Sequence, residues 1–307
     1  MYKRVLLKAF FLILPFASIA QYQWDFGGSI GASSFLGDVG GKDTPAKKFI
    51  GDLNMPTTRF GFGVYGRYKL SPLLSFQLAV AWDRISGDDK QATYVPRRGR
   101  NLSFRNDIYE MAFTTQVYFY EIPSLITSFK TTVDFRAYGF AGVGFFHHNP
   151  TANYKGEWVD LQPLQTEGVN YSLWGVSIPA GIGCYFSVNR MHRFGLELCW
   201  RKTFTDYLDD VSTTYVEPST LANPTAVALA NRSTEVARDP KIDEQYGKGV
   251  ELYVPGAPRG DSKAKDTWFT YSFTYSYAIR GKSSFYRSRY PGLFGKKNKK
   301  RKIRAKF

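Results

Sequence analysis

The residues of this 307-residue chain that could do chemistry are few. It has three histidines, of which His147 and His148 are adjacent and His192 stands alone. Neighbouring residues on a strand point to opposite faces of the sheet, so the adjacent pair is a poor start for a metal site. No cluster of acids around a histidine suggests general acid–base or nucleophilic catalysis. We therefore predict a protein that is not an enzyme, with no catalytic residue, no cofactor and no metal site.

An acidic segment offers two interpretations. Asp206, Asp209 and Asp210 lie within five residues of each other. Carboxylate oxygens are the ligands that Ca²⁺ prefers, so the segment could hold a surface calcium ion. Carboxylates in loops also accept hydrogen bonds from nearby backbone N–H groups, so a loop-capping role is at least as well supported. The sequence leaves both open.

The two cysteines test the expected strand register. Cys184 falls in step with Ile182 and Phe186, on the apolar face of its segment, whereas Cys199 falls in step with Glu197 and Arg201, on the polar face. Side chains on opposite faces of a sheet cannot reach disulfide geometry. We therefore predict two free thiols.

Eight segments of the chain alternate between apolar and polar residues with a period of two, which is typical of strands with one apolar face. In 194–201, for example, phenylalanine, leucine and tryptophan alternate with Gly195, Glu197, Cys199 and Arg201. The eight segments are 22–36, 60–70, 75–85, 105–120, 134–146, 171–188, 194–206 and 267–279.

The charged face of these segments should point inward, because charged side chains are costly against hydrocarbon. It also carries many glycines and serines, as a narrow interior requires. With eight strands the lumen should be filled by side chains rather than by water. We expect Glu110 and Glu197 to form ion pairs inside it with Arg67, Lys69 or Arg201.

The connections between segments are alternately short and long. A closed antiparallel barrel in a membrane has short turns on one side and long loops on the other. Turns are expected at 71–74, 121–133 and 189–193, and loops at 38–58, 84–104, 147–170 and 207–266. The fold class is therefore all-β: an eight-stranded antiparallel transmembrane β-barrel with long extracellular loops, short periplasmic turns and a basic C-terminal periplasmic tail. A soluble lipocalin-like barrel is the alternative. Long loops on one side only, and an aromatic-rich face that points outward, argue against that alternative.

The first twenty residues have the pattern of a secretory signal peptide. Lys3, Arg4 and Lys8 are basic, an apolar run covers 5–16, and Ser18-Ile19-Ala20 offers a cleavage site after Ala20. No later segment has about eighteen consecutive apolar residues, so a spanning helix is not expected. We predict a signal peptide at 1–20, an outer-membrane barrel at 21–280 and a separate tail at 281–307.

The charge of the chain is concentrated at its C-terminal end. The formal net charge is +15, yet the basic residues of 21–279 balance all 26 acidic ones. Of the fifteen excess positive charges, twelve lie in 280–307 and three in 1–20. Because a predicted signal peptide argues against a nucleic-acid partner, we favour periplasmic contacts for the tail. A solvated extension without a partner is equally supported. The candidate contact residues are Arg287, Arg289, Lys296, Lys297, Lys299, Lys300, Arg301 and Lys302, together with Leu125 and Phe129 in the turn at 121–133.

Four ordered motifs give the chain a resemblance to a known family. The motifs are Ser34–Val39, with Gly37 and Asp38; Phe104–Glu110; Phe145–Pro150, with Asn149 and Pro150, leading on to 156–168; and Thr205–Ser212, with Tyr207 and Asp209. In this order they resemble the PorG-like, DUF6089-type outer-membrane proteins of Bacteroidetes. The resemblance covers nearly all of 21–280, but the basic tail has no counterpart in the family pattern.

The resemblance implies an accessory component of the type IX protein secretion system. Members are associated with a periplasmic ring built from a lipoprotein and its partner. The expected partners are therefore outer-membrane lipids and periplasmic ring proteins, with no nucleic acid and no small-molecule substrate. Two alternatives stay open: a surface-binding protein that works through its extracellular loops, and a small solute channel, which the crowded lumen disfavours.

Overall fold

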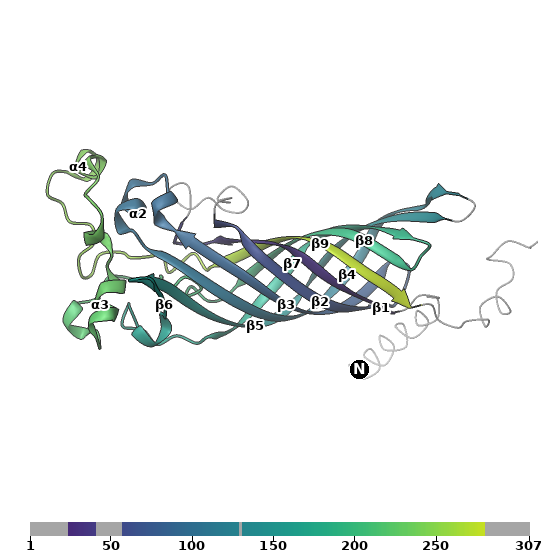
Figure 1. Ribbon diagram of the computed structural model, residues 1–307, viewed down its shortest axis with the longest axis horizontal. Coiled ribbons are helices and arrows are strands. Elements are labelled where there is room, and N and C mark those ends of the chain that lie inside the picture. Colours follow the sequence, from purple (N-terminus) through teal and green to yellow (C-terminus); the bar gives the residue numbers. More distant parts are fainter. Residues whose placement is uncertain (1–23, 41–56, 129–130, 280–307) are drawn as a thin grey trace, which may run out of the picture.

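The computed structural model describes residues 24–40, 57–128 and 131–279 (Figure 1). The predicted signal peptide and basic tail lie outside these residues. The strands are β1 (Trp24–Leu36), β2 (Arg59–Lys69), β3 (Leu74–Asp88), β4 (Ser103–Thr127), β5 (Thr132–Tyr154), β6 (Glu157–Asp160), β7 (Trp174–Val188), β8 (His192–Thr203) and β9 (Thr267–Ile279). The helices are α2 (Val95–Arg100), α3 (Pro224–Ala230) and α4 (Pro240–Tyr246), with short 3₁₀ turns at Asp89–Gln91, Gln162–Leu164, Pro218–Thr220 and Ser233–Glu235.

Eight of these strands close into one antiparallel barrel. Each pairs with its neighbours in the order β1-β2-β3-β4-β5-β7-β8-β9, and β9 pairs back onto β1 along the whole of β1, from Trp24 opposite Ile279 to Leu36 opposite Thr267. Strand β6 pairs with the far end of β5 and extends the wall there. The predicted all-β, eight-stranded antiparallel barrel is confirmed.

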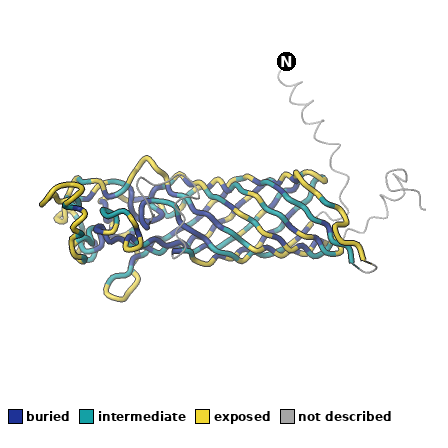
Figure 2. Tube along the Cα trace, turned by 90° about the horizontal axis from the view of Figure 1, so that it is seen from above, coloured by how far each residue is buried: buried dark blue, intermediate teal, exposed yellow. Residues whose placement is uncertain are grey.

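The apolar face of the barrel points outward, as the sequence pattern predicts. In β2, Phe60, Phe62 and Val64 are exposed, whereas Tyr65 and Arg67 are buried in the lumen. Buried and exposed residues alternate in this way along the shaft of the barrel (Figure 2). Large apolar side chains that face outward all round a barrel need a surrounding of lipid. No described helix is long and apolar enough to cross a membrane.

The two ends of the barrel differ. The end where β1 begins and β9 finishes also carries the connections at 70–73 and 189–191, and we call it the turn end. The opposite end carries the helices and the segment 204–266, and we call it the loop end (Figure 1). That segment contains helix α3, with Asn223 as its N-cap.

Two predicted boundaries are wrong. The expected turn at 121–133 is instead a β-hairpin, because β4 continues to Thr127 and β5 begins at Thr132. The sequence ended the fifth strand before Pro150, but β5 runs on to Tyr154 and gains β6 as a partner. Strands β4 and β5 are 25 and 23 residues long, against 15 for β3 and β7, so their hairpin extends past the other turns (Figure 1).

An irregularity in β4 explains why this hairpin looks like a turn in the sequence. The pairing of β4 with β5 shifts register between Ile122 and Ile126, and Ser124 has a positive φ of 55°. The Ser124 N–H donates to Asp134 Oδ1 at 2.8 Å, which fastens the irregular segment to β5. A bulge of this kind disrupts the alternation that marks a strand.

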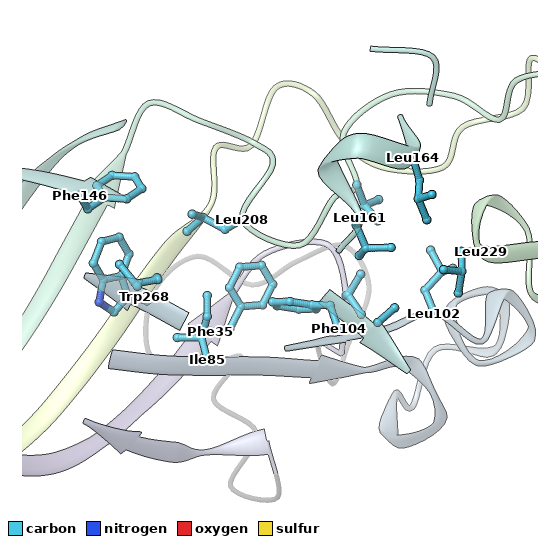
Figure 3. Close-up of a cluster of buried hydrophobic side chains, with 14 of the residues drawn as sticks. Phe35, Ile85, Leu102, Phe104, Phe146, Leu161, Leu164, Leu208, Leu229 and Trp268 are labelled. Atoms are coloured by element: carbon cyan, nitrogen blue, oxygen red, sulfur yellow. The ribbon is translucent and has the colours of Figure 1, made fainter. Parts of the chain in front are cut away.

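A hydrophobic cluster fills the barrel at the loop end (Figure 3). Trp268 and Phe146 meet edge to face with ring centroids 5.3 Å apart, and Ile85 and Ile108 are buried beside the loop residue Leu208. Phe35 packs against Phe104 nearer the loops. The inward face of the strands is therefore charged in the shaft and apolar where the loops begin.

We predict that Val80→Lys destabilises the barrel by about 2–4 kcal/mol, the cost of a lysine near the middle of the lipid-facing surface. Val80 is 53% exposed and pairs with Val64 and Met111. The measurement is reversible urea unfolding in lipid vesicles. Val250→Lys, at an exposed position in the loop-end segment, should change stability by less than about 0.5 kcal/mol. Equal losses for the two variants would contradict a lipid-facing Val80.

Candidate functional site

The lumen near the turn end holds a buried ion cluster around Asp25. Arg67 Nη1 lies 3.6 Å from Asp25 Oδ2, and Arg193 also pairs with this carboxylate. Arg67 donates from Nε and Nη2 to Gln77 Oε1 at 3.2 and 3.1 Å. Of the three cations offered as partners of Glu110 and Glu197, Arg67 thus pairs with neither and lies against Asp25 instead. Asp25 was missed by the sequence analysis, although it alternates with Trp24 and Phe26 and so had to face inward.

Tyrosine rings complete this part of the lumen. The Arg67 guanidinium lies 5.2 to 5.6 Å from the ring centroids of Tyr65, Tyr138 and Tyr185. Lys69 Nζ lies 5.8 Å from the centroid of Tyr118. This cation–π contact stands in place of the ion pair with Glu110 or Glu197 that the sequence offered for Lys69. No ion pair joins Lys69 to a carboxylate in the part of the chain that the structure describes.

A second ion cluster crosses the lumen further toward the loop end. Arg201 Nε lies 2.5 Å from Glu110 Oε2, Arg201 Nη2 lies 3.8 Å from Asp83 Oδ2, and Trp268 Nε1 donates to the same Asp83 oxygen at 3.3 Å. The structure thus brings Arg201 to Glu110, one of the two acids expected as its partner. Glu197 instead accepts from the Tyr138 hydroxyl at 2.9 Å.

Glycines make room for these side chains. A Cβ atom at Gly144 would lie 2.6 Å from Glu110 Oε1, and one at Gly61 would lie 2.1 Å from Asp83 Oδ1. The cavity left in this part of the lumen measures ≈ 50 Å³. It has room for little more than a water molecule or two, so the barrel shaft is a packed interior rather than a pore.

Apart from Glu110, which belongs to the second ion cluster, the residues of the family-like motifs gather at the loop end and tie the loops together. Gly37 is a position of close approach, because a Cβ there would lie 2.2 Å from Asp266 Oδ1. Asp38 Oδ2 accepts from the Asp261 N–H at 2.7 Å, and Asp209 accepts from the N–H groups of Val39 and Val211, each at 3.0 Å. Residues from the two ends of the chain are thereby fastened to each other.

The remaining motif residues have similar roles. The Asn149 amide donates to Asp160 Oδ1 at 3.0 Å, and the Pro150 carbonyl accepts from the Leu161 N–H at 2.9 Å, so both hold β6 and the turn after it. The Tyr207 ring stacks on Tyr171, with centroids 4.5 Å apart. Tyr171 in turn donates to Asp210 Oδ1 at 2.7 Å.

The structure favours loop capping over calcium for the acidic segment. Asp206 accepts from the Ser212 hydroxyl at 2.7 Å, Asp209 from two backbone N–H groups, and Asp210 from Thr166 and Tyr171. Among the described residues, no group of three or more His, Cys, Asp or Glu side chains is arranged to hold a metal ion.

Two buried arginines in the loops escaped the sequence analysis. Arg100 pairs with Asp89 at 2.8 Å and donates to the Asp38 carbonyl at 2.8 Å. Arg259 pairs with Glu167 at 3.0 Å and donates to the Asp210 carbonyl at 2.6 Å. All four side chains lie in the long loops, where no periodicity distinguishes a buried charge from an exposed one.

Burial raises the pKa values of the carboxyl groups at the loop end. It raises the pKa of Asp206 and of Asp210 to about 6, although Ser212 and Arg259 respectively favour their charged forms. Burial also raises the pKa values of Asp209 and Asp266 well above their usual range. Nearby carboxylates add to this rise: Asp38 acts most strongly on Asp209, and Asp209 acts most strongly on Asp266. These carboxyl groups therefore bind protons more tightly in the folded protein than in the unfolded chain.

The histidines and cysteines lie where the register places them. His148 is buried, with Nδ1 3.3 Å from Asn106 Nδ2, while His147 packs edge to face against Trp174 on the opposite face of β5. Cys199 is buried in the lumen and Cys184 is half-buried on the outer face, and both are free thiols. The prediction for the two cysteines is confirmed.

We predict that Glu110→Ala lowers the free energy of unfolding by about 3–5 kcal/mol, because it leaves the Arg201 guanidinium buried without its nearest carboxylate. Urea titration in detergent micelles measures the loss. The triple variant Asp83→Asn/Glu110→Ala/Arg201→Met, which removes the arginine together with both of its carboxylates, should recover most of it. Glu121→Ala, which removes a partly exposed partner of Arg136, should cost less than about 1 kcal/mol. An equal cost for Glu110→Ala and Glu121→Ala would contradict the buried pair.

We also predict that the loop-end structure becomes less stable as the pH rises. Since the folded pKa values of Asp206 and Asp210 are raised from 3.8 to about 6, the stabilisation present below 3.8 is lost as the pH rises through about 6. Amide hydrogen exchange in 206–213, corrected for intrinsic rates, should show weaker protection at about pH 8 than at about pH 5. Asp210→Asn should reduce this difference, and a larger protection at the higher pH would contradict the prediction.

Comparison with known proteins gives one family and several distant structures. The family described as "Domain of unknown function (DUF6089)" matches residues 3–222. No curated protein matches.

Three solved barrels align with most of this chain. They are Ail, the attachment invasion locus protein of Yersinia pestis, in complex with the heparin analogue sucrose octasulfate (11% identity, 84% of this chain and 99% of that chain, TM-score 0.34); the outer membrane protein OprG from Pseudomonas aeruginosa (10%, 84% and 97%, 0.35); and Neisserial surface protein A (8%, 85% and 98%, 0.32). Similarity at this level carries no argument about function, and the fold assignment rests on the strand pairing described above. The family match covers more than two thirds of the sequence, and the chain therefore belongs to the DUF6089 family.

Proposed function

We propose that this protein is a non-enzymatic outer-membrane barrel that anchors periplasmic machinery, as an accessory component of the type IX protein secretion system. In an outer membrane, the short turns of a barrel face the periplasm and the long loops face outward. The turn end is then periplasmic and the loop end extracellular. The family resemblance is the reason for naming the secretion system, and it makes the periplasmic ring the expected partner.

The observation that carries the proposal is the β4–β5 hairpin at the turn end. It extends past the neighbouring turns, and its residues Leu125 and Ile126 are 46% and 57% exposed. A barrel needs only about nine to eleven residues per strand to cross a bilayer, so part of these two strands is available for another task. Exposed apolar side chains beyond the membrane are typical of a protein contact.

Polar contacts hold the hairpin in place. Asp134 accepts from Ser124 and lies 3.7 Å from Arg190 of the next turn, while Arg136 pairs with Glu121 at 2.5 Å. A partner that binds the hairpin would therefore be connected to the neighbouring turn through the Asp134–Arg190 ion pair. Phe129 and the tail residues proposed as further contacts lie outside the described residues.

The packed lumen supports an anchoring role over a channel. Two ion clusters and a hydrophobic cluster occupy the interior in succession, and the cavity between them measures ≈ 50 Å³. A solute would have to displace several buried ion pairs to pass. The predicted outcome in planar bilayers is a conductance no larger than that of the bare membrane.

A second candidate is surface binding through the extracellular loops. The observation that favours it is the folded state of the loop-end segments, which have a hydrophobic cluster and buried ion pairs of their own. Loops held this firmly present a defined surface rather than a changeable one.

Affinity purification from native membranes tests the anchoring role. We predict that Ile126→Asp lowers the recovery of periplasmic secretion proteins about tenfold, as expected if docking weakens by about 1.4 kcal/mol. Val250→Asp, an equally drastic change at a 42% exposed loop-end position, should leave recovery unchanged. A chain ending at Lys282 reports separately on the tail.

The outcomes distinguish the parts of the proposal. Loss with Ile126→Asp alone assigns docking to the hairpin, and loss with the shortened chain alone assigns it to the tail and contradicts the hairpin. Recovery of no secretion component with the unmodified protein would overturn the secretion role, and the surface-binding candidate would take its place.

A further inference from the structure

A cleft at the loop end lies between helix α2, the end of helix α4 and the segment 252–264. It measures ≈ 340 Å³, which is at the small end of the range for small-molecule sites. Its lining combines tyrosines with charged side chains: Tyr94, Tyr215, Tyr246, Tyr253, Arg97 and Asp38. None of these residues contributes to the proposed periplasmic contact.

Two polar groups of this lining are buried and unsatisfied. The Tyr215 side chain is 4% exposed, and its hydroxyl has no hydrogen-bond partner within the described part of the chain. Arg97 Nη1 is likewise buried without a partner there. Such groups are uncommon in native proteins, because an unsatisfied buried donor costs free energy that a hydrogen bond would otherwise offset. A ligand that enters the cleft and reaches its wall would supply the missing partners.

The other arginines of the cleft are already engaged. Arg100 pairs with Asp89, and Arg259 pairs with Glu167. Neither carboxylate lines the cleft. Arg97 forms no ion pair with a described carboxylate. It is therefore the cation of this cleft that is available for an anionic group.

The cleft also offers an acceptor. Asp38 uses Oδ2 to accept from the Asp261 N–H at 2.7 Å, and its Oδ1 has no hydrogen bond to the described residues. The side chains of Arg97, Asp38 and Tyr215 therefore line one small space. Together they can donate to and accept from the hydroxyl groups of a polyol.

The tyrosine rings supply flat apolar surface. The Tyr94 and Tyr246 hydroxyls hydrogen-bond to each other at 2.6 Å, and the Tyr253 hydroxyl donates to the Pro96 carbonyl at 2.8 Å. With their polar ends occupied, these side chains present ring surface on which the C–H face of a sugar can pack. Tyr215 and Tyr253 meet edge to face, with centroids 6.3 Å apart, which fixes the orientation of the wall.

We infer that this cleft is a binding site for an acidic saccharide. The sugar ring packs on the tyrosines, its hydroxyl groups meet Asp38 Oδ1 and the Tyr215 hydroxyl, and its anionic substituent meets Arg97. The site stands independently of the anchoring role, because it uses the opposite end of the barrel and needs no periplasmic partner.

Titration of the full-length protein in detergent micelles, followed by ligand-observed NMR, tests the inference. The probes are methyl glucuronide and methyl glucoside, which differ in the carboxylate that Arg97 would bind. We predict that the glucuronide binds at least about tenfold more tightly, the effect of one charge-assisted hydrogen bond. Arg97→Gln should abolish this preference, and Lys248→Gln, which removes an exposed charge of the same loop outside the lining, should retain it.

A second variant separates binding from folding. Tyr215→Phe removes a hydroxyl that has no partner in the described protein, so its unfolding midpoint should equal or exceed that of the unmodified chain. Its affinity for both saccharides should nevertheless fall. Equal binding of the two saccharides, no binding of either, or a preference that survives Arg97→Gln would overturn the inference. Equally tight binding of a glutamate dipeptide would overturn the saccharide assignment, because the cleft would then recognise negative charge alone.

Discussion

Closure of the sheet between β1 and β9 is the constraint on which the rest of the structure depends. Once β9 pairs with β1, each of the eight barrel strands has one face toward the lumen and one toward lipid, and in the shaft each is paired on both sides. The charges of the inward face must then satisfy each other in a narrow space. Arg67 and Arg193 share Asp25, and Arg201 shares its charge between Glu110 and Asp83. The packed lumen follows from closure, and it supports the proposed anchoring role over a channel.

The two ends of the barrel then differ in the side chains that they present. At the turn end, β4 and β5 carry the wall beyond its neighbours and present exposed apolar side chains. At the loop end, carboxylates and two buried arginines join loops that are far apart in the sequence. The motif residues Asp38 and Asp209 belong to this second group. They hold the loops in one arrangement, and the cleft beside Asp38 exists because that arrangement is fixed.

The sequence pattern predicts the wall of the barrel but only part of the contacts inside the lumen. Alternation locates each of the eight strands and assigns Glu110 and Arg201 to the lumen, because a period of two depends on local geometry alone. It cannot give the partner of Arg67, since the height at which two inward side chains meet depends on the stagger of strands around the whole barrel. The irregular segment between Ile122 and Ile126 breaks the alternation of β4, so the sequence pattern predicts a turn where the β4–β5 hairpin lies. Arg100 and Arg259 lie in loops without any period.

Photo-crosslinking from position 125 in living cells tests the central claim most directly. A photoreactive residue in place of Leu125 samples what lies against the hairpin at the turn end, and the same residue in place of Val250 samples the loop end. The anchoring account predicts that periplasmic secretion proteins are captured from position 125 and not from position 250. Capture of the same proteins from position 250 alone, or of lipid alone from position 125, would contradict it.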